Sequence, residues 1–197
     1  HRDLHTAYRR QRQMCISDRY LGVATILGRL QRDLYSSNSF IGRWMASKNS
    51  VELINSNLFA HGGIHPAVAQ SDISLDKMNE IIRSKYYRPY FPKKEKGIEE
   101  LLTSTKKGIC WYRGYFRESP TQEEVERGLE MFNAKAIVVG HMLQSKVNRS
   151  FEGKVIGIDV HHPKDYSKSW PTPHSEGLLI VGERYFRVLH TGEKRAL

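Results

Sequence analysis

The sequence predicts a mixed α/β fold, because a helical N-terminal part precedes a C-terminal part that is rich in short strands. Apolar side chains recur close to helical spacing at 20–35, and three short apolar runs in the C-terminal half have the length of buried strands. With 197 residues, 39% of them hydrophobic and 26% charged, the chain can bury a sizeable core. We therefore expect a single domain over 1–197, with a helical region at 1–56 and a strand-rich part at 57–197.

Local signals predict the elements of the first half. Residues 1–48 read as helical, and "SVELINSNLFA" at 50–60 reads as two short strands joined by an Asn-Ser-Asn turn. A helix is expected at 73–87, with Ser74 as its cap and a carboxylate in its first turn. A shorter helix is expected for "IEELLTST" at 98–105.

A capping box opens the second half. Thr121 followed by Glu124 starts the helix expected for "SPTQEEVERGLEMFNA" at 119–134. The apolar runs then predict three strands and a hairpin partner that follows Gly182 and Glu183. These expected strands are 136–140, 153–160, 177–182 and 184–191.

The charge balance favours an anionic partner. The chain has 31 Lys and Arg against 21 Asp and Glu, a net charge of +10, which suits a nucleic acid, a phosphorylated substrate or an acidic membrane surface. The basic clusters at 9–12 and 93–96 are more typical of solvated faces. No apolar run is long enough to span a bilayer, and the N-terminal residues lack the apolar core of a secretory signal. Cys15 and Cys110 form no CxxC motif, so we expect no disulfide framework and a cytoplasmic protein.

Two histidines each follow an apolar strand. His61 comes after "NLFA" and precedes Gly62 and Gly63, and His141 comes after "AIVVG". Pockets form at the carboxyl ends of strands in α/β proteins, and neutral imidazole is the commonest metal ligand. The glycines would let an ion or a phosphate approach the backbone closely. The pair is therefore a candidate metal site, and the alternative is two partly buried histidines bonded to nearby carbonyls.

The stretch "GICWYRGYF" at 108–116 places Arg113 among aromatic residues. A guanidinium group held in this way suits bidentate contact with phosphate oxygens. The alternative is an aromatic strand with a surface arginine, or cation–π packing.

A further polar group follows the strand expected at 153–160. It consists of Asp159, His161 and His162. These side chains could orient metal ligands or contact a substrate, or they could be loop residues that face water.

Four segments in order over residues 57–181 resemble the C-terminal half of the calcineurin-like metallophosphoesterases. They are "NLFAHGGIHP", "GICWYRGYF", "AIVVGHMLQ" and "FEGKVIGIDVHHP" followed by "EGLLIV". The match is to the bacterial branch that is similar to serine/threonine phosphatases and Shewanella-like phosphatases. The resemblance implies part of a β-sandwich flanked by helices, with two divalent metal ions (Mn, Fe, Zn or Mg) at its strand ends. It also implies that His61 and His141 are ligands of one ion and that Arg113 contacts the substrate phosphate.

The implied function is metal-dependent hydrolysis of phosphate monoesters, phosphoproteins among them, with a phosphorylated substrate as the partner. The N-terminal half of the family carries GDxHG, GDxxDRG and GNH(E/D), whereas this sequence has no Gly-Asp and no Asn-His pair. Catalytic sites normally need three or more protein ligands, so two imidazoles alone would bind an ion weakly. The chain is thus expected to be part of a phosphatase domain or a truncated, non-catalytic homologue. A basic nucleic-acid-binding module is disfavoured, because the basic residues are spread along the chain and no nucleic-acid motif occurs.

Overall fold

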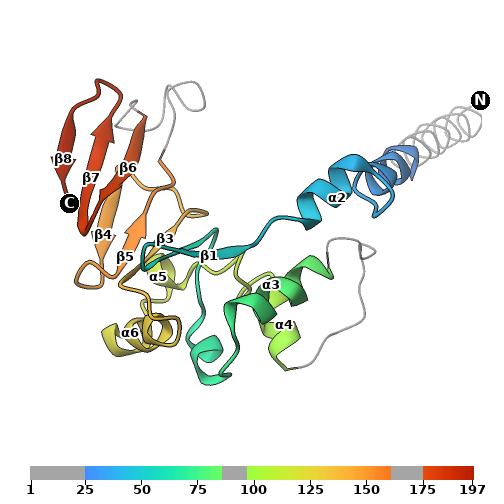
Figure 1. Cartoon of the computed structure of the whole chain (residues 1–197), viewed down its shortest axis with the longest axis horizontal. Coiled ribbons are helices and arrows are strands. Elements are labelled where there is room, and N and C mark those ends of the chain that lie inside the picture. Colours follow the sequence, from blue (N-terminus) through green and yellow to red (C-terminus); the bar gives the residue numbers. More distant parts are fainter. Residues whose placement is uncertain (1–24, 86–96, 161–174) are drawn as a thin grey trace, which may run out of the picture. The chain divides into compact units, whose positions relative to one another are not determined.

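A five-stranded sheet and a three-stranded sheet form the strand-rich part of the chain (Figure 1). The computed structural model describes residues 25–85, 97–160 and 175–197. The chain divides into two units, of which the first comprises 1–48 with 84–90 and the second 49–83 with 91–197. Both sheets belong to the second unit, so the predicted mixed α/β class is confirmed.

The described part of the first unit is helical, as expected. Residues 25–34 form one helix, and α2 spans Phe40–Ala46. Ser39 caps α2, because its side-chain oxygen accepts a hydrogen bond of 2.8 Å from the Gly42 nitrogen. The helix predicted for residues 1–24 lies outside the described residues.

The larger sheet begins with the predicted hairpin. Strand β1 (Val51–Ile54) pairs antiparallel with β2 (Asn57–Ala60). Asn55 and Ser56 form the turn with positive φ angles of 49° and 61°, which matches the twist of a tight hairpin.

The centre of this sheet is parallel, and its outer pairs are antiparallel. Strand β2 lies beside β3 (Ala136–Val139), and β3 lies beside β5 (Val155–Gly157), both in parallel. Strand β4 (Asn148–Ser150) adds to β5 in the antiparallel direction, which gives the order β1-β2-β3-β5-β4. The sheet therefore directs the carboxyl ends of β2, β3 and β5 to the same edge.

Strand β3 is buried on both faces, which explains its unbroken apolar sequence. Ile137 and Val139 pack into a core with the helices, whereas Ala136 and Val138 pack into a core with Tyr185 of the smaller sheet. The helices of the first core are η1 (Pro66–Gln70), α3 (Leu75–Arg83), α4 (Ile98–Thr103), α5 (Gly114–Arg117) and α6 (Gln122–Glu130).

The predicted helix caps are present. The Ser74 hydroxyl accepts a hydrogen bond of 3.2 Å from the Lys77 nitrogen at the start of α3. Thr121 and Glu124 form the reciprocal capping box of α6, with bonds of 2.9 and 3.2 Å.

The smaller sheet is an antiparallel meander. It consists of β6 (Glu176–Val181), β7 (Arg184–Leu189) and β8 (Lys194–Ala196). The hairpin through Gly182 and Glu183 was predicted, whereas β4 and β8 were not, and β5 is shorter than the strand expected at 153–160. No helix within the three described ranges is both long and apolar enough to cross a bilayer. The cytoplasmic location stays a prediction.

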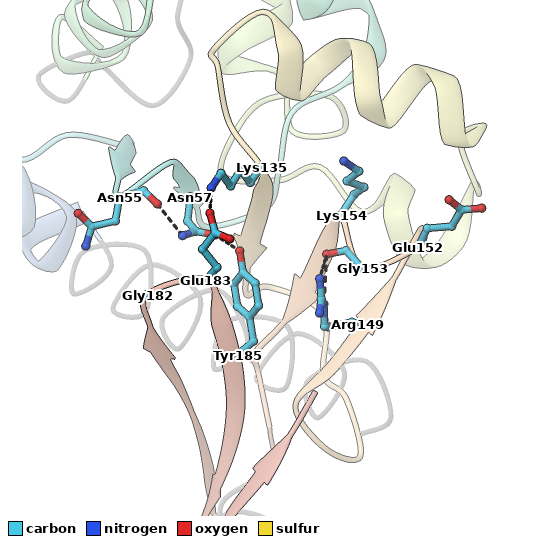
Figure 2. A pocket seen from close by; sticks show the side chains of 10 residues that line it. All are labelled: Asn55, Asn57, Lys135, Arg149, Glu152, Gly153, Lys154, Gly182, Glu183 and Tyr185. Atoms are coloured by element: carbon cyan, nitrogen blue, oxygen red, sulfur yellow. Dashed lines mark hydrogen bonds and ion pairs between the residues drawn. The ribbon is translucent and has the colours of Figure 1, made fainter.

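Polar contacts join the two sheets where β2, β3 and β5 begin. The Tyr185 hydroxyl donates a hydrogen bond of 2.6 Å to Oδ1 of the buried Asn57, and Lys135 forms an ion pair with Glu183 (Figure 2). These residues border a hollow of about 350 Å³. The groups around this hollow bond one another, and these bonds connect the two sheets. The hollow lies at the opposite ends of the strands from the two histidines.

Candidate metal and phosphate site

The two predicted histidines lie at the same edge of the larger sheet. Strands β2 and β3 are parallel neighbours in a register that pairs Ala60 with Val139. One residue further on, the Gly140 nitrogen donates a hydrogen bond of 2.9 Å to the carbonyl oxygen of His61. Parallel pairing therefore brings together two histidines that are 80 residues apart in the sequence.

The imidazole rings face each other through specific nitrogens. Nε2 of His61 lies 3.0 Å from Nδ1 of His141, with the ring centroids 4.8 Å apart and the ring planes at 63°. Zinc binds imidazole nitrogen at about 2.0–2.1 Å, so two such ligands at about 90–109° would stand roughly 2.8–3.4 Å apart. The observed separation fits two ligands of one ion. The same separation also suits a hydrogen bond from one ring to the other.

The backbone of His141 adopts an unusual conformation that directs its ring. Its φ angle is 62°, in the left-handed region that a histidine seldom occupies. Such a conformation costs on the order of 1 kcal/mol and persists where the surrounding structure holds it. Here the Gly140 bond to His61 and a bond of 2.7 Å from the Met142 nitrogen to the Gly140 oxygen hold the turn.

The surroundings of His141 favour its neutral form. Burial lowers the pKa of His141 below its ordinary value, and the positive charge of Arg113 lowers it further, while Asp159 acts in the opposite direction. A neutral imidazole offers a lone pair to a metal ion. The second ring nitrogen, Nε2, is buried and has no hydrogen-bond partner among the described residues. Metal-bound histidines usually donate this N–H to an acceptor, and the described residues supply none here.

The glycines after His61 allow the backbone of residues 109–112 to pack closely against the turn. The nitrogens of Gly62 and Gly63 both donate to the Ile109 carbonyl oxygen, at 2.7 and 3.1 Å. A Cβ atom at Gly62 would lie 2.7 Å from that oxygen and 2.8 Å from the Tyr112 nitrogen. The expectation that this glycine pair leaves space for an ion or a phosphate is therefore wrong, since the chain at 109–112 fills the space.

Tyr115 fixes the same turn from the other side. Its hydroxyl donates to the Ile64 oxygen at 3.0 Å and accepts from the Ile64 nitrogen at 3.2 Å. The ring is buried, and burial raises the pKa of Tyr115. The turn that carries His61 is thus clamped by backbone and side-chain bonds from the 108–116 segment.

The same segment brings Arg113 to the histidine pair. Nη1 of Arg113 donates to the Trp111 oxygen at 3.1 Å, and its guanidinium carbon lies 5.8 Å from the centre of the Trp111 ring. The Trp111 ring meets His141 edge to face, with centroids 5.5 Å apart and planes at 85°. The segment is a turn followed by α5, so the alternative of an aromatic strand is wrong, whereas the cation–π contact is present.

A second arginine near the pair was not predicted. Arg117 lies four residues after Arg113 at the end of α5, and its positive charge also lowers the pKa of His141. The spacing in "RGYFR" is the signal that could have identified it, because residues four apart share one face of a helix.

The polar group predicted after β5 adds no metal ligand among the described residues. Asp159 follows β5, where its backbone oxygen accepts a hydrogen bond of 2.7 Å from the Gln144 nitrogen. His161 and His162 lie outside the described residues. Within the described ranges, no group of three or more His, Cys, Asp or Glu side chains could hold a metal ion. The described part of the chain therefore offers two candidate metal ligands, with the positive charges of Arg113 and Arg117 near His141.

Comparison with known proteins gives structural matches only. No protein-family model matches the chain, and no curated protein matches it. A crystal structure of the cold-active protein-tyrosine phosphatase from a psychrophile, Shewanella sp., matches with 34% identity and a TM-score of 0.71 over 84% of this chain and 47% of that one. A structure of a cold-active protein tyrosine phosphatase at 1.1 Å matches with 34% identity and a TM-score of 0.70, over 84% and 46% of the two chains.

A point mutant of cold-active protein tyrosine phosphatase gives a similar result. It matches with 34% identity and a TM-score of 0.73, over 91% of this chain and 52% of that one. The chain thus spans about half the length of the solved structures that it matches.

The packing around the two histidines predicts that alanine will destabilise the protein at Gly62 and will be tolerated at Gly140. Gly62→Ala should lower the free energy of unfolding by about 2 kcal/mol, because its methyl group has no room against the 109–112 backbone. Gly140→Ala is the matched control, since a Cβ there would lie 3.6 Å from the nearest atom, the His61 oxygen. Urea denaturation followed by circular dichroism measures both, and equal stabilities would contradict the packing described.

Proposed function

We propose, from the similarity of this chain to about half of a calcineurin-like phosphatase, that it takes part in the hydrolysis of phosphate monoesters. The observation that carries the proposal is the approach of His61 Nε2 to His141 Nδ1 at the ends of neighbouring parallel strands. The similar structures are described as protein tyrosine phosphatases, so proteins phosphorylated on tyrosine are the substrate class proposed. The proposed cofactors are divalent ions of manganese, iron, zinc or magnesium.

In this proposal, the two histidines are ligands of one ion. His61 would bind through Nε2 and His141 through Nδ1, the nitrogens that face each other. A bound divalent ion supplies positive charge that polarises a phosphoryl oxygen. The remaining ligands, and the second ion that the family resemblance implies, would come from outside the described residues.

Two guanidinium groups would bind the phosphate. Arg113 is held beside the histidines by its bond to the Trp111 oxygen, and Arg117 follows one helical turn later. The Arg117 side chain is exposed, and its charge and that of Arg113 both reach His141. Guanidinium groups bind phosphate through charge-assisted hydrogen bonds, which are stronger than neutral ones. Their role is to hold and orient the phosphoryl group next to the histidine pair.

Substitution of either histidine tests the proposed site. In protein expressed from its complete reading frame, His61→Asn or His141→Asn should reduce manganese-dependent hydrolysis of phenyl phosphate by at least about a hundredfold, because a metal ligand is lost. Asparagine is chosen because it tolerates the left-handed backbone at His141. Release of inorganic phosphate is the measurement.

The control is His190→Asn, which changes an exposed histidine after β7 and should leave the rate unchanged. Near wild-type rates in both site variants would refute the assignment. Wild-type protein that binds the metal but releases no phosphate would be a non-catalytic homologue, and the hydrolytic part of the proposal would fall.

Arg113 should act mainly on phosphate binding. Arg113→Ala should weaken competitive inhibition by inorganic phosphate by about tenfold or more, since a hydrogen bond to a charged group contributes about 1.5–3 kcal/mol. Arg127→Ala, on the exposed surface of α6, is the control. An inhibition constant that does not change in Arg113→Ala would remove this residue from the site.

A further inference from the structure

We infer that the exposed indole of Trp111 determines specificity, by stacking the aromatic leaving group of an aryl phosphate such as phosphotyrosine beside the histidine pair. The inference rests on the proposed function, because it requires a phosphoryl group bound near His61, His141 and Arg113. It adds a residue that favours aryl esters over alkyl esters, such as those of phosphoserine.

Trp111 is exposed on a segment that is otherwise anchored. Its side chain is 46% exposed, whereas Ile109 and Tyr112 on either side are 1% and 2% exposed. The nitrogens of Trp111 and Tyr112 both donate to the Gly108 oxygen at 2.8 Å, which closes a tight turn. A large aromatic side chain presented to solvent by a fixed turn is pre-organised for stacking, because little conformational freedom is lost on binding.

The position of the ring fits a substrate held at the proposed site. The Trp111 centroid lies 5.5 Å from that of His141 and 5.8 Å from the guanidinium carbon of Arg113. The two groups proposed to lie next to the phosphoryl group therefore both adjoin the indole. The substituent of a phosphate ester bound beside these two groups would be within reach of this ring.

Two other exposed apolar residues closely follow strands β3 and β5. Leu143 is 46% exposed two residues after His141, and Ile158 is 38% exposed where its nitrogen donates to the Val139 oxygen at 2.9 Å. The Trp111 indole beside the Arg113 guanidinium complements a ligand with a flat apolar part and a doubly charged anionic part. An aryl phosphate has this composition, whereas an alkyl phosphate offers no aromatic face.

The preference should be modest and measurable. Aromatic pairs gain an amount equivalent to about a two- to tenfold change in affinity beyond the area that they bury. We therefore expect the zinc-loaded protein, expressed from its complete reading frame, to bind phenyl phosphate about two- to tenfold more tightly than ethyl phosphate. Titrations followed by ³¹P NMR measure both affinities without using tryptophan as the reporter.

Three variants isolate the role of the indole. Trp111→Leu should bring the ratio of the two ester affinities close to one, and the affinity for inorganic phosphate, measured in the same titrations, shows how far loss of the ring contact with Arg113 weakens binding of both esters alike. Trp111→Phe should keep most of the preference, because it keeps an aromatic face. Trp44→Leu is the matched control, since Trp44 is 55% exposed on α2 and should leave the ratio unchanged.

The titrations separate failure of this inference from failure of the proposed function. If inorganic phosphate binds but Trp111→Leu leaves the ratio of the two esters unchanged, the role of Trp111 is refuted and the phosphate site stands. If inorganic phosphate does not bind to the wild-type chain, the proposed site and this inference both fall. Loss of the preference in Trp111→Leu together with its retention in Trp111→Phe would support the inference.

Discussion

The parallel pairing of β2 with β3 is the constraint on which the site depends. Its register places Ala60 opposite Val139, so the residues that follow both strands emerge side by side. This pairing, together with the bond from the Gly140 nitrogen to the His61 oxygen, places two histidines 80 residues apart within 3.0 Å of each other. Both faces of β3 are buried, one against helices and one against the smaller sheet, and this burial fixes the register. Packing of β3 in both cores thus also fixes the positions of the two imidazoles.

A second set of contacts attaches the 108–116 segment to the turn that carries His61. The Ile109 oxygen accepts from Gly62 and Gly63, and the Tyr115 hydroxyl bonds both backbone groups of Ile64. The turn after β2 and the 108–116 segment are therefore held together. The turn carries His61, and the segment carries the aromatic and cationic side chains. Rigid support of this kind is what a binding site requires, because small displacements of its groups weaken binding and catalysis.

Much of the framework could be predicted from the sequence, since its signals are local. A stretch of about ten residues is enough to recognise the β1–β2 hairpin, the capping box of α6 or the apolar run of β3. The resemblance of four ordered segments to calcineurin-like phosphatases is confirmed by the structural matches. Strands β4 and β8, with the sequences NRS and KRA, have no apolar pattern and form only because a neighbouring strand pairs with them. The role of Gly62 depends on tertiary contacts with the distant 109–112 backbone, which spacing in the sequence cannot reveal.

The most direct test of the proposed metal site is to follow the imidazole nitrogens during a zinc titration of the ¹⁵N-labelled protein by long-range ¹H–¹⁵N spectroscopy. The account predicts that His61 Nε2 and His141 Nδ1 shift together and saturate at the same zinc concentration, because both bind one ion. Signals that titrate independently, or that do not respond to zinc while other histidines do, would contradict it.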